Sequence, residues 1–332
     1  MIRSLVAKRT DDAEQSFTVG RNLDQDKLTE AIADEDCFLW IDLIDPKGAE
    51  IDWLEDRFKL NPAVVQDLKR DDRRPALLVY PDYIFLSLFE PHITLNRVEG
   101  LEVHCIITDR CFITVRPSNA VSVDDAYRRV AQNPDAWPAG VAYCFYLTAQ
   151  FITDSYYPLV DRISNQLNHL EEKLLNGQPD ELSRRAVYRI KQQLINLRQM
   201  VAPQREVFSN VLGAKRLTES DNIRDLFRHL YERLLRVYDV IDSQRDLSNN
   251  VLDMMQNQES RKLVEGVNRL TILSMIFLPL TFFMSLFELN FATTYDPFVL
   301  PISGGILFLM VIAAMIISAG GMIYAFRRQG WL

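Results

Sequence analysis

Two long stretches without a charged residue lie near the C-terminal end of the chain. The first covers 18 residues from Leu270 to Phe287, and the second covers 29 residues from Phe298 to Phe326. A helix needs about 20 predominantly apolar residues to cross the hydrocarbon core of a bilayer. The pattern therefore predicts two transmembrane helices, over about residues 270–290 and 298–326. The alternative, two helices buried in a large soluble domain, fits less well because soluble cores rarely contain so long an uncharged helix.

Residues 1–140 alternate between strand-like and helix-like stretches. Apolar runs typical of strands occur at Cys37–Leu43, Tyr83–Phe89, Glu102–Ile107 and Cys111–Val115. A helix is expected to start at Asp45 and Pro46, and a second, short helix follows at Pro62–Leu68. The last two strands are expected to join through a turn at Asp109 and Arg110. This part of the chain is therefore predicted to be a mixed α/β domain.

Strand signals stop at about Val141, and apolar residues then recur at helical spacing. Asp161–Leu175 and Glu181–Val201 show this spacing, and Gly177–Pro179 breaks the chain between them. From Leu217 no proline or glycine occurs until Gly266, so one very long helix is expected to run into the first predicted span. Helices this long usually pack into bundles or oligomers. The predicted fold class is an α+β cytosolic domain (1–140), long stalk helices (141–268) and a transmembrane domain (269–332).

The charges around the two predicted spans are distributed unevenly. Arg261, Lys262 and Arg269 precede the first span, and Arg327 and Arg328 follow the second, whereas the loop at 288–297 has no basic residue. The positive-inside rule then places both ends of the chain in the cytoplasm. The formal net charge of −8 argues against a nucleic-acid partner held by a basic surface. We therefore expect a multi-pass protein of the inner (plasma) membrane.

Chemistry other than transport finds little support in the sequence. The four cysteines form no C-x-x-C pair and are expected to be reduced, buried thiols. His104, Cys105 and Cys111 can be read as zinc ligands or as buried structural residues, and the apolar strands around them favour the second interpretation. No phosphate-binding glycine-rich loop and no catalytic constellation occurs. We expect neither an enzyme nor a bound cofactor, and no ATP-driven pump.

A polar stripe runs along the long helix and through the first predicted span. Steps that alternate between four and three residues keep side chains on one helical face. Starting at Asp253, these steps reach the following positions: Asn257, Ser260, Val264, Val267, Thr271, Ser274, Leu278, Thr281, Ser285 and Glu288. Several copies around a symmetry axis would direct the hydroxyls of this stripe into a central pore, with Leu278 as a hydrophobic constriction. Two other interpretations of the hydroxyls remain open: they pack against neighbouring helices, or they bond their own backbone carbonyls. Glu288 is either a solvated loop charge or part of a mouth that concentrates cations.

Five motifs along the chain resemble the CorA family of divalent-cation transporters. They are Trp40–Pro46 (WIDLIDP), Asp82–Leu86 (DYIFL), Phe112–Arg116 (FITVR), Ile276–Phe282 (IFLPLTF) and Arg327–Leu332 (RRQGWL). The resemblance implies a funnel-shaped homopentamer in the lipid bilayer, in which the first span of each subunit lines the pore and the second forms an outer ring. The implied pore-lining positions are Val267, Leu270, Ser274, Leu278, Thr281 and Ser285. The resemblance also implies that Asp253 lies near the inner mouth.

The chain departs from the family at the outer mouth of the pore. The family's Gly-Met-Asn motif is replaced by Glu288, Leu289 and Asn290, so only the asparagine is retained. Because magnesium sheds its water reluctantly, its selection should depend on an intact mouth. The departure therefore favours the ZntB-like branch, which includes the CmaX-type proteins, and implies zinc uptake coupled to protons or to the membrane potential. The alternatives are a magnesium/cobalt/nickel channel of the same family, and a non-transporting cation sensor or scaffold at the membrane.

Overall fold

The computed structural model describes residues 1–9, 17–70, 75–94, 97–176, 181–218, 220–291 and 304–328. At 25, 134–136, 286–291, 304 and 307 only the backbone is described. The chain divides into two compact units, Met1–Leu252 and Asp253–Leu332. Helix α7 (Asp221–Phe291) contributes residues to both.

The first unit is built on a mixed sheet of strands β1 (Ile2–Arg9), β2 (Phe17–Arg21), β3 (Cys37–Ile44), β4 (Leu77–Val79), β5 (Ile84–Thr94), β6 (Arg97–Ile107) and β7 (Cys111–Arg116). Within the described residues the sheet has seven strands in the order β2-β1-β3-β7-β6-β5-β4. β3 and β7 are paired in parallel, and the other neighbours are antiparallel. These two central strands are almost wholly buried, which explains why they are apolar except at Asp42, Thr114 and Arg116.

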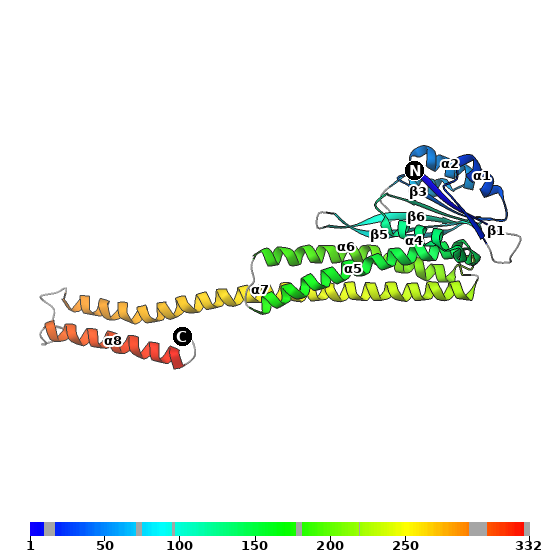
Figure 1. Ribbon diagram of the computed structural model, residues 1–332. Coiled ribbons are helices and arrows are strands. Elements are labelled where there is room, and N and C mark those ends of the chain that lie inside the picture. Colours follow the sequence, from blue (N-terminus) through cyan, green and yellow to red (C-terminus); the bar gives the residue numbers. More distant parts are fainter. Residues whose placement is uncertain are drawn as a thin grey trace. The chain divides into compact units, whose positions relative to one another are not determined.

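Helices cover both faces of this sheet (Figure 1). α1 (Gln25–Ala33), α2 (Gly48–Phe58) and α3 (Pro62–Leu68) lie on one side, and α4 (Val121–Gln132) and α5 (Val141–Leu175) lie on the other. The expected helix start at Asp45 was wrong, because α2 begins at Gly48. Asp45 has a φ of 43° and its carboxylate accepts a hydrogen bond from the Ser118 amide at 3.0 Å. Its left-handed backbone ends the strand and delays the helix.

The outer edge of β5 is satisfied by side chains instead of by another strand. β4 pairs only with residues 84–86 of β5. Further along, the Phe89 amide donates to Gln204 Oε1 at 3.1 Å, and Tyr156 Oη donates to the Phe89 carbonyl at 2.7 Å. Gln204 Nε2 in turn donates to Tyr156 Oη at 2.7 Å. Pro91 has no amide hydrogen to offer at this edge. The sheet is thereby fastened to α5 and to α6 (Glu181–Gly213).

The N-terminus of α4 is held by a residue distant in sequence. Its N-cap residue, Ala120, makes no side-chain cap. The carboxylate of Glu90 on β5 accepts the Ser122 amide through both oxygens, at 3.1 and 3.2 Å. Burial raises the pKa of Glu90, and the hydrogen bonds from Ser122 oppose that rise. The helix therefore depends on the sheet for its first turn.

Helices α5, α6 and α7 carry apolar seams that explain their length. In α6 the buried residues recur in steps of three and four, and all but Gln204 are apolar: Val187, Ile190, Leu194, Leu197, Val201, Gln204, Phe208 and Val211. The same repeat occurs in α7 at Ile223, Phe227, Leu230, Leu234, Val237 and Ile241. This 3.5-residue period is typical of helices packed along their length. A short 3-10 helix, η1 (Pro134–Ala139), precedes α5.

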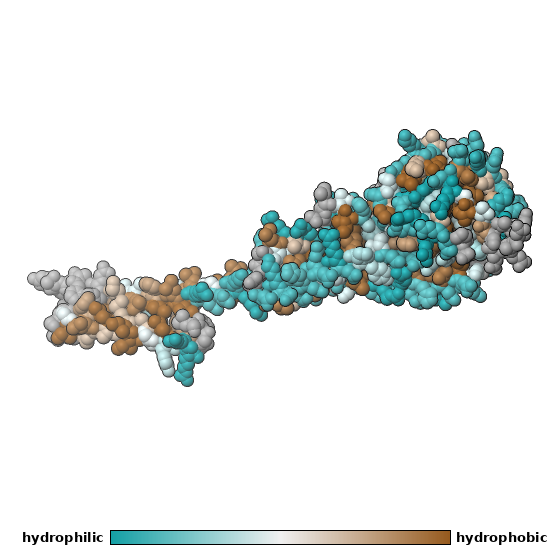
Figure 2. Space-filling view, viewed as in Figure 1, coloured by the Kyte–Doolittle hydropathy of each residue, from teal (hydrophilic) through white to brown (hydrophobic). Residues whose placement is uncertain are grey.

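The second unit contains apolar helix surface that its own residues do not cover. It comprises the C-terminal part of α7 and helix α8 (Gly304–Arg328). Two helical segments are long and apolar enough to cross a membrane, and their most apolar windows are only 6% and 0% buried. Hydrophobic residues cover this surface in Figure 2. The two predicted apolar helices are confirmed, and the fold class agrees with the expectation of an α/β domain, long helices and a C-terminal helix pair.

Candidate ion pathway along helix α7

Three hydroxyl side chains of the predicted stripe lie on α7 in the second unit. Ser274 and Thr281 are exposed, and Thr271 is partly exposed. Each hydroxyl donates a hydrogen bond to a carbonyl of its own helix: Thr271 Oγ1 to Val267 at 2.8 Å, Ser274 Oγ to Leu270 at 2.9 Å and Thr281 Oγ1 to Leu278 at 2.8 Å. The backbone-bonding interpretation of these hydroxyls is therefore confirmed. It does not exclude a lumenal role, because a hydroxyl that donates its hydrogen keeps both lone pairs of its oxygen for accepting.

The apolar members of the stripe are also uncovered in a single chain. The exposed fractions are 61% for Val267, 64% for Leu270 and 75% for Leu278. Asp253 and Ser285 are likewise exposed. Side chains of this size are normally buried in a soluble helix, so these residues require a bilayer or further copies of the chain around them.

The outer end of the stripe is described only in part. The backbone of α7 is helical through Glu288 and Asn290 and ends at Phe291. The side chains of Glu288 and Asn290 lie outside the described residues. Their assignment to the pore mouth therefore stays a prediction.

Pro279 interrupts the backbone hydrogen bonding of α7 inside the apolar segment. A proline has no amide hydrogen, so it cannot bond the carbonyl of the residue four positions earlier, Met275. The nearby hydroxyl of Thr281 bonds the Leu278 carbonyl and not that of Met275. The proline therefore removes one backbone hydrogen bond from this segment of α7.

The cluster of His104, Cys105 and Cys111 is buried structure. All four cysteines of the chain are free and buried. Burial raises the pKa of the Cys105 and Cys111 thiols, the latter to about 11, which opposes the thiolate form that binds zinc. The His104 ring stacks on Phe85 with centroids 5.8 Å apart. No group of three or more metal-ligating side chains occurs among the described residues.

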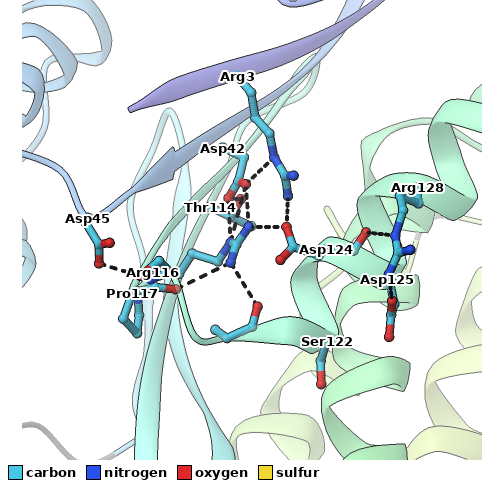
Figure 3. Close-up of polar contacts among 12 residues, drawn as sticks. Arg3, Asp42, Asp45, Thr114, Arg116, Pro117, Ser122, Asp124, Asp125 and Arg128 are labelled. Atoms are coloured by element: carbon cyan, nitrogen blue, oxygen red, sulfur yellow. Dashed lines mark hydrogen bonds and ion pairs between the residues drawn. The ribbon is translucent and has the colours of Figure 1, made fainter.

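A buried charge cluster explains one of the family-like motifs. Asp42 in the WIDLIDP segment is fully buried and receives Thr114 Oγ1 at 2.6 Å, Arg3 Nε at 2.7 Å and Arg116 Nη2 at 3.1 Å. Asp124 on α4 pairs with both arginines, at 2.7 and 2.6 Å. Figure 3 shows the two guanidinium groups between the two carboxylates. The cluster joins β1, β3, β7 and α4, and every charge in it has a partner, as buried charges require. The sequence identified this motif only by its family resemblance and did not predict the role of Asp42. The signal for that role was an aspartate inside a strand that is otherwise apolar.

The fold and the uncovered helices define a membrane protein with an α/β domain, long helices and two C-terminal apolar helices. Residues 35–328 match the family described as CorA-like Mg²⁺ transporter protein. The chain is 27% identical over 279 residues to the cobalt/magnesium transport protein CorA of Thermotoga maritima, covering 83% of this chain and 78% of that protein. It is 25% identical over 314 residues to the zinc transport protein ZntB of Yersinia pseudotuberculosis, covering 91% and 90%. The complete CorA magnesium transporter structure from Methanocaldococcus jannaschii matches with a TM-score of 0.79 at 20% identity, covering 99% of this chain and 98% of that chain.

The chain belongs to the CorA-like Mg²⁺ transporter family. It is accordingly a metal ion transporter and not an enzyme, as the sequence predicted. Relatives named for magnesium and cobalt and relatives named for zinc match it at similar identity. The family is thus established, and both metal classes occur among its relatives.

Proposed function

We propose that this CorA-family transporter takes up zinc across the inner membrane as a homopentamer, with both termini in the cytoplasm. The carrying observation is the row of Thr271, Ser274 and Thr281 hydroxyls on an exposed and otherwise apolar part of α7. One helix cannot enclose water. Five copies that turn this row toward a common axis form a polar channel, and α8 then faces lipid.

The proposed path begins at the outer ends of the α7 helices. Glu288 and Asn290 gather cations at the mouth, where five copies multiply their charge and their carbonyl oxygens. The ions then pass Ser285 and the hydroxyl row as hydrated species, cross a constriction at Leu278 and leave near Asp253. The membrane potential drives inward movement by about 2.3 kcal/mol per elementary charge per 100 mV. A divalent ion gains about twice that, so uptake needs no nucleotide.

Zinc is preferred over magnesium because of the sequence at the mouth. Glu288-Leu289-Asn290 stands where the family has Gly-Met-Asn. Glutamate resists backbone conformations that glycine adopts, and a magnesium ion, which keeps its water shell, depends on a shaped mouth to be recognised. The second candidate is magnesium or cobalt uptake. It is supported by the family's description and by the similarity to the CorA protein of Thermotoga maritima.

Uptake into proteoliposomes that hold the purified protein tests these functions. Zinc and magnesium influx is measured with and without an inward proton gradient. Zinc influx that rises with the gradient supports the proposal. Magnesium influx indifferent to protons supports the second candidate. No influx of either ion from folded oligomers contradicts both, and makes a cation sensor or scaffold the leading interpretation.

The mouth assignment has its own test. Glu288→Gln and Asn290→Ala are expected to lower zinc uptake, because each removes a group that attracts or holds the arriving cation. Glu265→Gln, an exposed carboxylate on α7 outside the stripe, serves as the control for a general loss of negative charge. If both mouth variants transport at the wild-type rate, the mouth lies elsewhere.

A further inference from the structure

Basic residues lie next to the apolar segments of both helices in the second unit. Arg261, Lys262 and Arg269 precede the apolar part of α7, and Arg327 and Arg328 end α8. All five side chains are exposed. None of them makes a hydrogen bond or an ion pair within the part of the chain that the structure describes. Their charges are thus left for an external partner.

The arginines of α7 in the first unit are in a different situation. Arg228 Nη1, for example, lies 3.1 Å from a carboxylate oxygen of Asp225, three residues earlier on the helix. Glu265 is four residues from both Arg261 and Arg269, which is also a pairing distance on a helix. It forms an ion pair with neither of them among the described residues. The basic side chains at 261–269 therefore extend into the surroundings and do not neutralise a charge on their own helix.

These basic side chains lie on the side of α7 opposite the polar stripe. At about 100° per residue, Arg261, Lys262 and Arg269 fall within a sector of about 100°. The stripe positions 264, 267 and 271 fall within another sector, whose centre is about 150° away from the first. Copies that turn the stripe toward a common axis therefore turn the basic side chains outward, toward lipid.

The surface next to these cations is apolar. From 272 to 283 the basic side of α7 continues with apolar residues only: Ile272, Leu273, Ile276, Pro279, Leu280 and Phe283. On α8, Ile323 and Tyr324 precede the two arginines and are 45% and 70% exposed. In Figure 2 the hydrophobic surface of this unit ends in hydrophilic residues. A ligand that matches both features has an anionic group and hydrocarbon chains, whereas a free phosphate ion would use the cations alone.

We propose that Arg261, Lys262 and Arg269 of α7, with Arg327 and Arg328 of α8, bind the phosphate group of an anionic phospholipid in the cytoplasmic leaflet. The two spans cross the bilayer in opposite directions, so the start of the first and the end of the second lie at the same surface. Basic residues at this depth attract anionic headgroups, and the acyl chains cover the adjacent apolar surface. The inference rests on the proposed function for the direction of the pore axis and for the cytoplasmic termini.

Native mass spectrometry of the delipidated, full-length protein in a non-ionic detergent tests this site, because it resolves the binding of single lipids. The probes are phosphatidylglycerol, which is anionic, and phosphatidylcholine with the same acyl chains, which has no net charge. A basic residue near an anionic surface contributes about 1 kcal/mol, which corresponds to about fivefold in affinity. We expect phosphatidylglycerol to bind at least about fivefold more tightly than phosphatidylcholine, and Arg269→Gln and Arg327→Gln each to weaken its binding by about fivefold.

Matched variants separate charge at this site from charge elsewhere. Arg269→Lys and Arg327→Lys keep the positive charge and should retain most of the wild-type affinity. Arg228→Gln removes a 57% exposed arginine from the same helix in the first unit, and it should leave the affinities for both lipids unchanged. Gel filtration verifies that each variant keeps the wild-type oligomer.

A competition experiment identifies the source of the phosphate. Glycerol 3-phosphate carries a phosphate group but no acyl chains, so at equal concentration it should not displace phosphatidylglycerol. Displacement would assign the cations to a soluble phosphate compound and overturn the inference. Equal affinity of the wild type for the two lipids, or unchanged phosphatidylglycerol binding in both glutamine variants, would overturn it as well.

Transport is measured separately, so the two proposals can fail separately. Lipid selectivity in a protein that moves no divalent cation supports the lipid site and contradicts the proposed function. Zinc uptake by a protein that binds both lipids equally supports the proposed function and contradicts the lipid site.

Discussion

Replacing Asp42 by asparagine removes one negative charge from the centre of the α/β domain. The side chains of Asp42 and Arg116 are 0% exposed, and that of Arg3 is 17% exposed. In the wild type two carboxylates balance two guanidinium groups. Asparagine has the size of aspartate but no charge, and its amide turns hydrogens toward arginine donors that lie 2.7 and 3.1 Å from the present oxygens. The variant therefore leaves two arginines to share the single carboxylate of Asp124, with one positive charge in excess.

The expected cost of this change is large. Removing one partner of a buried ion pair destabilises a protein by about 3–5 kcal/mol. For a domain of this size about 1 kcal/mol corresponds to 2–4 °C in the midpoint of thermal unfolding. Asp42→Asn should then lower the midpoint by about 6–20 °C. The measurement is thermal unfolding of the full-length detergent-solubilised protein, followed by far-ultraviolet circular dichroism and by tryptophan fluorescence.

The control is an exposed ion pair in the same unit. Asp52 pairs with Lys69 at 2.8 Å, with side chains 60% and 44% exposed. Asp52→Asn should cost at most about 1 kcal/mol, because solvent screens such pairs. If Asp42→Asn and Asp52→Asn shift the midpoint by the same small amount, the buried cluster does not hold the domain together and the reasoning is refuted.

Two further predictions concern the same domain. A Cβ at Gly100 would lie 2.5 Å from Phe89 Cδ1 and 2.7 Å from Met200 Sδ, so Gly100→Ala should destabilise the protein by about 1–3 kcal/mol. The midpoint of denaturant unfolding measures this loss, and Gly48→Ala is the control, because a Cβ at Gly48 meets no neighbour within 4 Å. Equal midpoints for the two variants would contradict the prediction. Glu90 is buried with its pKa raised above the ordinary value of 4.5, so it favours folding most when protonated and loses that contribution as pH rises through its folded pKa. The stability of Glu90→Gln relative to the wild type should therefore increase from pH 4.5 to neutral pH, and parallel stability curves for the two proteins would count against this.

The elements that sequence reasoning found are those with a local signal. The central strands β3 and β7 are marked by mostly apolar runs, and α5 and α6 by apolar residues at helical spacing. The long helix α7 is marked by the absence of proline and glycine between Leu217 and Gly266. The two C-terminal helices are equally evident, because about 20 uncharged residues have few other uses. Each of these patterns is complete within one segment, so no knowledge of the partner segment was needed.

The elements that were missed depend on distant partners. Strand β1 has the sequence IRSLVAKR, in which charged residues hide the apolar core, and it becomes a strand by pairing with β2 and β3. Helix α4 has no capping side chain of its own, because Glu90 supplies the cap from β5. Arg3 and Asp124 meet Asp42 only after the sheet has formed. Tertiary contacts decide such cases, and propensity does not.

For the candidate pathway, the sequence predicted which residues share a helix face but not the hydrogen bonds that they make. Spacing alone aligned the hydroxyls of Thr271, Ser274 and Thr281 on one stripe, but it left the direction of their hydrogens open. The structure resolves that direction in favour of the backbone. The roles of Glu288 and Asn290 rest on the family resemblance, because no local pattern distinguishes a mouth residue from a solvated one.

The four native cysteines give this protein an experimental convenience. All are buried, and burial raises the pKa of each thiol. Maleimides react with exposed thiolates, so they should bypass the native side chains while the protein is folded. A single cysteine introduced at Ser274 or at Thr281 would then be the dominant labelling site without any native cysteine being replaced. The chain already provides the unreactive background that spectroscopic studies of a labelled helix usually have to engineer.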